Sequence, residues 1–323
     1  MIDLSIIIPV YNALPLLERT LDSIFSQHTK YSFEVVMVDD GSTDNSVQYI
    51  QNRREKNIIL LQQLNAGPAA ARNQGVVNAH GRYCAYLDAD DYWNDGFIEK
   101  TVSFLDNHPG CVAVSVGQKH ITVSGEGVKP KCIDNYHNPL VLDDFWGFWS
   151  EHMHICTGSA VIRTDTLRQS GGQRTELRVT EDLEFWALIS TYGKWGMIPE
   201  LLFVSDGTSL IIEKDKWIKK MSVRWSNAPT IEEWEKRIAC RIPKDDEAIV
   251  NAYNKVRSSI SEMLTRCQML SGRYSLSRRE ALNNADGYSG GIVKRMMLVC
   301  RHSRLLWFCL CRFLLYREYH RFK

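Results

Sequence analysis

The stretch that decides the fold is Tyr83-Cys84-Ala85-Tyr86-Leu87-Asp88-Ala89-Asp90-Asp91, an apolar run that ends in three carboxylates. A short run with aromatic and apolar residues on both faces predicts a buried central strand, and ligands of open α/β sheets bind beyond the carboxyl ends of such strands. Three carboxylates beside a core strand repel one another and lose hydration unless a hard cation or donated hydrogen bonds neutralise them. The stretch therefore predicts a divalent metal that carries a phosphate. The alternative is a polar turn that caps a helix near Asn94 and Asp95.

Three strand–loop–helix units precede this stretch. Apolar runs predict strands over residues 4–10, 33–38 and 58–61, and a helical pattern follows each of them. In the third unit Pro68 can open the helix, and the alanines after it let the helix lie close to the sheet. Three consecutive units of this kind predict a parallel, doubly wound sheet in which the carboxylate strand is the fourth.

The loops after these strands offer an aromatic ring, an acid and a cation. Tyr11 could stack on a base, Asp39 could accept a hydrogen bond from the base's ring nitrogen, and Arg72 suits a phosphate. The first turn contains no glycine, which argues against a dinucleotide-binding enzyme. Each residue also has a structural alternative: core packing for Tyr11, a turn and helix cap for Asp39, and a solvated helix position for Arg72.

Composition and charge bound the class of protein. The chain has 323 residues, of which 44% are hydrophobic and 24% charged, so neither a disordered nor a fibrous class is favoured. Its net charge of +1 hides an asymmetry: residues 292–323 hold eight Lys and Arg against one Glu, a local +7, which leaves −6 on the first 291 residues. An acidic body repels phosphate backbones, so no nucleic acid is expected as a partner.

The cysteines and the apolar segments predict a location. Nine cysteines without metal-type spacing, and a start at Met1-Ile2-Asp3 without a secretory signal, predict reduced thiols in a cytoplasmic chain. No run reaches the roughly 18 apolar residues that a membrane-spanning helix needs. Membrane contact is therefore expected to be peripheral, on the inner face of the cell membrane.

Four motifs together resemble the ordered signature of family 2 glycosyltransferases of the bacterial polysaccharide-biosynthesis type. They lie in residues 5–12 (SIIIPVYN), 38–44 (VDDGSTD), 65–75 (NAG with ARNQG) and 87–91 (LDADD). The resemblance implies the GT-A fold, a Rossmann-like, mostly parallel mixed sheet flanked by helices, over residues 1–210. Residues 1–95 would then be the nucleotide-binding half and residues 96–210 the acceptor half.

The same resemblance implies roles for individual residues. Pro9, Tyr11 and Asp39 would hold uracil or another base, and Asp88 would hold the ribose. Asp90 would bind a divalent metal, Mn²⁺ or Mg²⁺, together with Asp88, and Asp91 is a rival ligand. The full set expected to bind the nucleotide sugar is Pro9, Tyr11, Asp39, Asp40, Arg72, Asp88 and Ala89.

A second acidic segment, Thr180-Glu181-Asp182, opens an apolar helix. A threonine followed by two acids is ordinary chemistry for a helix N-terminus, and this is the structural alternative. By the resemblance, Glu181 and Asp182 form the acceptor-side acidic pair, and Asp182 is the general base. Trp186, one turn later, could wall the acceptor pocket or pack in the core.

The last third, residues 211–323, is predicted to be a mainly helical extension. Apolar residues at helical spacing from Ile249 to Leu270 predict one amphipathic helix. Residues 296–316 are apolar but carry Arg301, Arg304 and Arg312. Such a helix could lie on an anionic membrane, or could dock on the protein with its cations solvated.

These observations, with the resemblance, predict a metal-dependent transferase that moves one sugar from a nucleotide sugar to a glycan or lipid-linked acceptor. Inversion of configuration and a role in cell-surface polysaccharide synthesis are what the resemblance implies. The lack of a spanning helix disfavours a processive membrane synthase. Two alternatives are a nucleotidyltransferase on the same type of sheet and a non-catalytic glycan-binding or assembly protein. A homo-oligomer is left open.

Overall fold

The computed structural model describes residues 2–121, 127–128, 133–207, 214–288 and 291–320. The chain divides into two compact units, residues 1–175 with 185–211 and residues 176–184 with 212–323. The division that the sequence predicted at residue 210 and the last three residues of its basic tail lie outside the described residues. The sequence did not predict that residues 176–184 group with the later helices.

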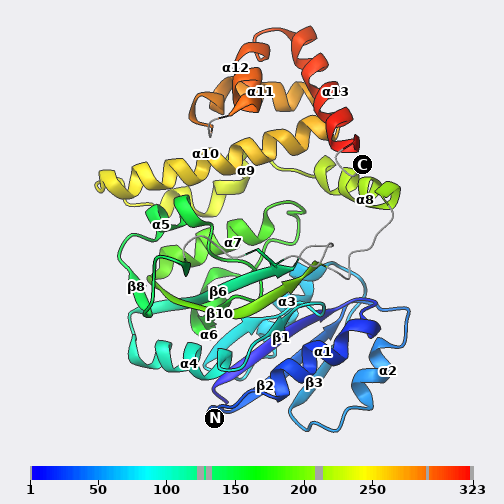
Figure 1. The fold of residues 1–323 in the computed structure, drawn as a ribbon, viewed down its shortest axis with the longest axis vertical. Helices are drawn as coiled ribbons and strands as arrows, with labels where there is room; N and C mark the ends of the chain where they lie inside the picture. Colours follow the sequence, from blue (N-terminus) through cyan, green and yellow to red (C-terminus); the bar gives the residue numbers. More distant parts are fainter. Residues whose placement is uncertain (1, 122–126, 129–132, 208–213, 289–290, 321–323) are drawn as a thin grey trace. The chain divides into compact units, whose positions relative to one another are not determined.

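The first unit is built on a mixed ten-stranded sheet with the order β3-β2-β1-β4-β9-β6-β10-β5 (Figure 1). β7 pairs with β6 and β8 with β10. The strands are β1 (Leu4–Val10), β2 (Phe33–Asp39), β3 (Ile58–Gln62), β4 (Tyr83–Tyr86), β5 (Tyr92–Trp93), β6 (Cys111–Ile121), β7 (Gly127–Val128), β8 (Leu140–Leu142), β9 (Ala160–Arg163) and β10 (Lys194–Asp206).

The predicted sheet is confirmed. Strands β1 to β4 pair in parallel, and the continuous apolar runs form them because both faces of the sheet are covered. β9 inserts antiparallel between β4 and β6, which makes the sheet mixed. The carboxylate strand ends earlier than its apolar run suggested, at Tyr86, so that Leu87 and the acids form a loop.

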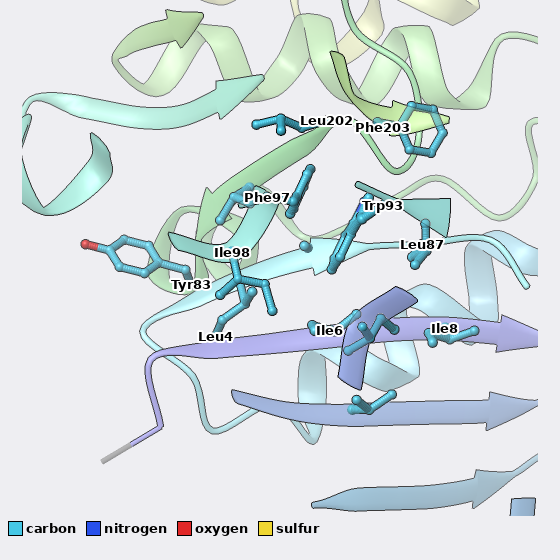
Figure 2. Packing of buried hydrophobic residues seen from close by; sticks show 14 of the residues in the cluster. Leu4, Ile6, Ile8, Tyr83, Leu87, Trp93, Phe97, Ile98, Leu202 and Phe203 are labelled. Carbon is cyan, nitrogen blue, oxygen red and sulfur yellow. The ribbon is translucent and has the colours of Figure 1, made fainter. Parts of the chain in front are cut away.

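Helices lie on both faces of this sheet. They are α1 (Leu14–Phe25), α2 (Ser46–Gln51), α3 (Pro68–Val77), α4 (Phe97–Asn107), α5 (Phe145–His152), α6 (Thr164–Ser170) and α7 (Glu181–Ile189). One face of β1, formed by Leu4, Ile6 and Ile8, packs in a core with residues of α1, α2 and α4. Figure 2 shows this core, in which the rings of Trp93 and Phe97 stack 3.9 Å apart.

The other face of β1 meets α3 at unusually close range. A β-carbon at Gly75 would lie 2.3 Å from Cγ2 of Ile7, so only glycine fits there. Ala69 and Ala71 are buried in the same helix, as the small residues of this segment predicted. The close approach fixes the helix that carries Arg72 against the central strand.

The aromatic segment from Phe145 to Trp149 contributes to the core. Asp144 caps α5 by accepting a hydrogen bond from the Gly147 N–H at 2.8 Å. Phe145, Trp146 and Trp149 are buried, and Phe145 packs against Trp195. This cluster also encloses His154, beside the ring of Phe145.

His154 makes the stability of the fold sensitive to acid. It is 1% exposed, and neither ring nitrogen has a hydrogen-bond partner among the described residues. Burial, with a smaller contribution from His152, lowers the pKa of His154 to about 3. Because the unfolded chain binds this proton near the ordinary pKa of 6.5 and the folded chain does not, stability is lost as pH falls below 6.5.

Between pH 7 and pH 5 the unfolding free energy of the unsubstituted chain falls because His154 takes up a proton only when the chain unfolds. We expect the fall to be about 2 kcal/mol smaller in His154→Leu, at about 1.4 kcal/mol per pKa unit. Urea denaturation at the two pH values measures this difference. The matched control is His137→Leu, because His137 is exposed. Equal pH dependence in the two variants would contradict a buried neutral imidazole.

The second unit is helical, as the sequence predicted for the last third. Its helices are α8 (Lys214–Ser226), α9 (Ile231–Trp234), α10 (Glu247–Leu270), α11 (Tyr274–Asn284), α12 (Ile292–Cys300) and α13 (Arg304–His320). α10 confirms the predicted amphipathic helix. α11 and α13 pack along it (Figure 1), around a core that includes Met269, Ala281 and Trp307.

The prediction of one helix over residues 296–316 is wrong, because two helices meet there. α12 ends at Cys300, and Ser303 starts α13 by accepting a hydrogen bond from the Leu306 N–H through its hydroxyl oxygen at 3.3 Å. Arg301, between the helices, pairs with Asp286 at 3.0 Å. The serine and this ion pair end the first helix inside an apolar run.

None of the described helices is long and apolar enough to cross a membrane.

Candidate active site

The loops after β1, β2 and β4 meet at one edge of the sheet. Val10 pairs with Asp39 in the parallel β1–β2 register, and the Asp40 N–H donates to the Val10 carbonyl at 2.8 Å. On the other side of β1, the Leu87 N–H donates to the Ile7 carbonyl at 3.0 Å. The carboxyl ends of these strands therefore bring the first, second and fourth motifs together in the first unit.

Tyr11 and Asp39 lie side by side on this edge. Tyr11 is 54% exposed, so the alternative that it packs in the core is wrong. Asp39 is buried, and its carboxylate accepts from the Ser42 N–H at 3.2 Å, which makes a turn. Asn12 has left-handed backbone (φ 49°), and its side-chain oxygen accepts from the Thr43 N–H at 2.8 Å. The first two loops are thus tied together, and the Tyr11 ring lies on their surface.

Asp40 joins the second loop to the third. Its carboxylate accepts hydrogen bonds from the Gln63 side chain at 2.8 Å and from the N–H groups of Ala66 and Gly67 at 2.8 and 2.9 Å. These donors belong to the chain itself, so in this structure Asp40 positions the start of α3. A direct contact with a nucleotide stays a prediction for this residue.

Arg72 and Asp88, which the sequence placed in separate motifs, form an ion pair between a buried guanidinium and a partly exposed carboxylate. The Arg72 guanidinium donates to Asp88 Oδ1 at 2.6 Å and to the Gln173 side chain at 3.2 Å. Arg72 is buried and lies over the ring of Tyr86, 5.9 Å from its centroid, so the alternative of a solvated helix residue is wrong. The pair fixes the carboxylate of Asp88 and places a cation beside it.

Helix α1 holds the carboxylate loop from one side. The Thr20 hydroxyl lies 2.9 Å from the Ala89 carbonyl oxygen and 2.8 Å from that of Asp91, and donates to them. Arg19 donates to the Asp90 carbonyl at 2.5 Å and forms an ion pair with Asp206. These hydrogen bonds therefore fix the backbone between Ala89 and Asp91 through its carbonyl groups and do not use the carboxylates.

The end of β10 holds the same loop from the other side. The Asp206 N–H donates to Asp91 Oδ1 at 3.0 Å, and Asp91 is buried. Sequence reasoning missed Arg19, Thr20 and Asp206, because Arg19 and Asp206 are 187 residues apart and no motif links them. Only the pairing of distant strands brings these partners to the loop.

Burial and mutual repulsion raise the pKa values of two carboxyl groups in the loop. The pKa of Asp90 is raised mainly by burial and next by the Asp88 carboxylate, against a smaller opposing effect of Arg19. The pKa of Asp91 is raised to about 8, by burial first and then by Asp88 and Asp90. The loop thus holds more negative charge than its neighbours neutralise. In the described part of the chain, no three His, Cys, Asp or Glu side chains are already gathered as metal ligands.

The second acidic segment begins α7, and residues 176–184 belong to the second unit. Thr180 is not an ordinary helix cap, because its hydroxyl donates to the Val179 carbonyl and its backbone is left-handed (φ 61°). A β-branched residue rarely adopts this conformation. Trp234 holds it there, since its indole N–H donates to the Thr180 carbonyl at 3.3 Å. Such strain concentrates at functional sites.

The acids around Asp182 have arginine partners within the second unit. Glu181 lies 3.5 Å from the Arg224 guanidinium, and the fully buried Glu184 accepts two hydrogen bonds from Arg237 at 2.8 and 2.6 Å. Asp182 lies between them in the first turn and is half-buried. These ion pairs fix the turn that carries Asp182.

Trp186 lies in the core of the first unit, on the later part of α7. It is 0% exposed, and its ring packs against Tyr86, Phe185 and Trp195. Its indole N–H has no hydrogen-bond partner among the described residues. The position matches the packing alternative, and an acceptor-side role for Trp186 stays a prediction.

The chain is similar to several known proteins. Residues 5–168 match the family described as glycosyl transferase family 2. An uncharacterized glycosyltransferase of Rickettsia felis is 30% identical over 217 residues, which are 66% of this chain and 35% of that protein. The poly(ribitol-phosphate) beta-N-acetylglucosaminyltransferase TarS of Staphylococcus aureus is 34% identical over 132 residues, 40% of this chain and 22% of TarS.

A solved structure supports the fold. The crystal structure of S. aureus TarS 1-349 in complex with UDP has a TM-score of 0.60 and 18% sequence identity, and the match covers 100% of this chain and 92% of that one. At this identity the likeness shows a shared fold. The chain spans about a third of the length of the Rickettsia relatives that it matches.

Proposed function

This chain belongs to glycosyl transferase family 2, and we propose that it transfers a single sugar from a nucleotide sugar, a UDP-sugar, to a hydroxyl of a glycan or lipid-linked acceptor. The observation that carries the proposal is the ion pair of the buried Arg72 with the partly exposed Asp88 at the carboxyl edge of the sheet, in one unit with Tyr11 and Asp39. The names of TarS and of its UDP complex support a UDP-sugar as donor. A role in cell-surface polysaccharide synthesis is part of the same proposal.

Different residues at this edge of the sheet would bind different parts of the donor. Tyr11 would offer its exposed ring to the base, and Asp39 on the neighbouring strand would accept from the base's ring nitrogen. Asp88, held by Arg72, would accept from the ribose hydroxyls, and the guanidinium beside it would attract the diphosphate. Pro9 and Ala89 would contact the donor through the strand end and the loop.

Asp90 and Asp88 would hold a divalent cation, Mn²⁺ or Mg²⁺. Carboxylate oxygens are the ligands that such an ion prefers, and a cation would compensate the burial and the repulsion by Asp88 that raise the pKa of Asp90. Asp91 is the weaker candidate, since one of its oxygens already accepts from the Asp206 N–H. When bound, the ion would supply charge neutralisation for the departing nucleoside diphosphate.

Asp182 would act as the general base. It would take the proton from the acceptor hydroxyl as that oxygen attacks the anomeric carbon, the bond to the nucleoside diphosphate breaks, and the configuration inverts. The strained Thr180 and the paired Glu181 and Glu184 support this role, because they fix the first turn of α7. Glu181 would lie on the acceptor side of the reaction.

Nucleotide binding tests the proposal directly. We expect UDP with Mn²⁺, at about a hundred times its dissociation constant, to raise the melting temperature by roughly 5 °C, because it binds only the folded chain. GDP and dTDP should give smaller shifts. Tyr11→Ala should reduce the UDP shift, while Tyr319→Ala, at another exposed tyrosine, should keep it. Equal absence of a shift with all three nucleotides would exclude this donor site.

A further inference from the structure

Helix α13 has two apolar faces, and its own unit covers only one of them. The covered face consists of Trp307, Leu310, Cys311 and Leu314, at the spacing of three and four residues that one side of a helix presents. These side chains belong to the core of the second unit, and the Trp307 indole N–H donates to the Ser277 hydroxyl oxygen at 3.0 Å. This face accounts for the packing of α13 on its neighbours.

The opposite face of α13 is also apolar, but it is exposed. Leu305, Phe308, Phe313 and Tyr316 are 70%, 45%, 49% and 64% exposed, and their spacing of three, five and three residues keeps them on one side of the helix. A row of large apolar side chains is unfavourable in water, and such a row on a surface marks an interaction site. The exposed face of α13 therefore indicates a second apolar surrounding.

Helix α12 extends this surface. Ile292 and Val299, two turns apart, are 71% and 70% exposed. Among the described residues, eight of the fifteen exposed large hydrophobic side chains lie between residues 292 and 319. Such a concentration in less than a tenth of the chain marks an interaction site rather than the scattered exposure that is usual on a surface.

The charges around these side chains select the chemistry of the partner. Arg295, Arg304, Arg312 and Arg317 are all exposed, and Glu318 is the only acid between residues 292 and 320. Two copies of the chain that met through this face would bring like charges together. An anionic partner with an apolar interior would match the arginines and the apolar side chains at once.

A hollow at the end of α13 adds a place for an anion. It has a volume of about 600 Å³ and is lined by Phe313, Tyr316, Arg317 and His320, with Arg266 from α10. Two guanidinium groups and an imidazole thus border a partly aromatic hollow. Arginine binds phosphate oxygens in pairs, and tyrosine favours the boundary between apolar and polar surroundings.

We propose that α12 and α13 form a docking surface for an anionic lipid bilayer. The exposed Leu305, Phe308 and Phe313 enter the boundary of the acyl chains, and the surrounding arginines contact the lipid phosphates. The helices lie in the plane of the bilayer. The inference concerns the second unit alone and does not depend on the sugar-transfer proposal.

Co-sedimentation of the full chain with vesicles tests the surface. We expect binding to vesicles that contain phosphatidylglycerol, weaker binding to pure phosphatidylcholine, and a loss of binding as salt rises. Phe308→Ser with Phe313→Ser should weaken binding more than tenfold, and Arg312→Gln about fivefold, the equivalent of one basic residue near the surface. Both changes are at exposed positions, and the melting temperature verifies that the variants fold.

A matched variant and a second readout make the test decisive. Leu64→Ser with Val77→Ser changes two exposed apolar residues of the first unit, at 92% and 74% exposure, and should leave vesicle binding unchanged. Equal weakening in both double variants, or no binding to anionic vesicles, would overturn the proposal. So would a stable oligomer in light scattering that Phe308→Ser with Phe313→Ser dissociates, because the face would then be an interface between copies.

Discussion

Asp90→Asn is expected to reduce kcat/KM for sugar transfer by about a hundred- to a thousandfold, the size of effect seen when a group that stabilises transition-state charge is removed. The physical reason is the charge of the loop. Burial and Asp88 raise the pKa of Asp90, and a divalent cation bound there would compensate the charge of this carboxylate. An amide of the same shape keeps the packing and removes that charge.

Two measurements assign the effect of Asp90→Asn to the site. Calorimetric titration with UDP should show weaker binding in Mn²⁺ and unchanged binding in chelator. The melting temperature without ligand should stay the same or rise, because one of several repelling carboxylates has gone. The control is Asp95→Asn, because Asp95 lies five residues after Asp90 and is exposed. Full turnover in the Asp90 variant would remove this residue from the mechanism.

Asp182→Asn is expected to lower kcat by about a hundred- to ten-thousandfold, the usual contribution of a positioned general base. In contrast to the Asp90 variant, its affinity for UDP should be unchanged with and without Mn²⁺, because Asp182 acts on the acceptor hydroxyl. The arginine partners of Glu181 and Glu184 should preserve the turn in the variant.

A suitable control for this variant is Asp165→Asn. Asp165 is an exposed acid in the first turn of α6, so its substitution changes a helix-terminus charge of the same kind. A loss of kcat in both variants would point to helix stability rather than proton transfer. A rise in KM for UDP-sugar with unaltered kcat in Asp182→Asn would place this residue in donor binding instead.

The sheet was predictable from sequence because its signals are local. Strand β1 was predicted with its observed bounds, Leu4–Val10, since an uninterrupted apolar run can be buried on both faces. The helix from Glu247 to Leu270 was predictable in the same way, from its spacing. The antiparallel direction of β9 was not predictable, because a strand's direction depends on partners that lie far away along the chain.

The candidate site was predictable in its residue types and less so in their partners. The sequence brought Arg72 and Asp88 to one edge, but not into an ion pair, which needs the depth at which α3 packs on Ile7. Asp40 and Asp91 looked like ligands, yet donors of the chain itself already bond to them. The break at Ser303 was not predicted because the apolar run continues on both sides of it. The start of the next helix depends on the hydrogen bond of one hydroxyl, which the apolar pattern does not show.

The support of the carboxylate loop by α1 and β10 limits how this motif can be transplanted. Thr20 and Arg19, on an earlier helix, donate hydrogen bonds to its carbonyl groups. The Asp206 N–H, on a later strand, donates to the side chain of Asp91. Residues 87–91 grafted alone onto another parallel sheet would lack these hydrogen bonds, and the acidic side chains would not keep their positions. The smallest part of this protein that would keep the loop in place is therefore discontinuous, and its segments come from both ends of the sheet domain.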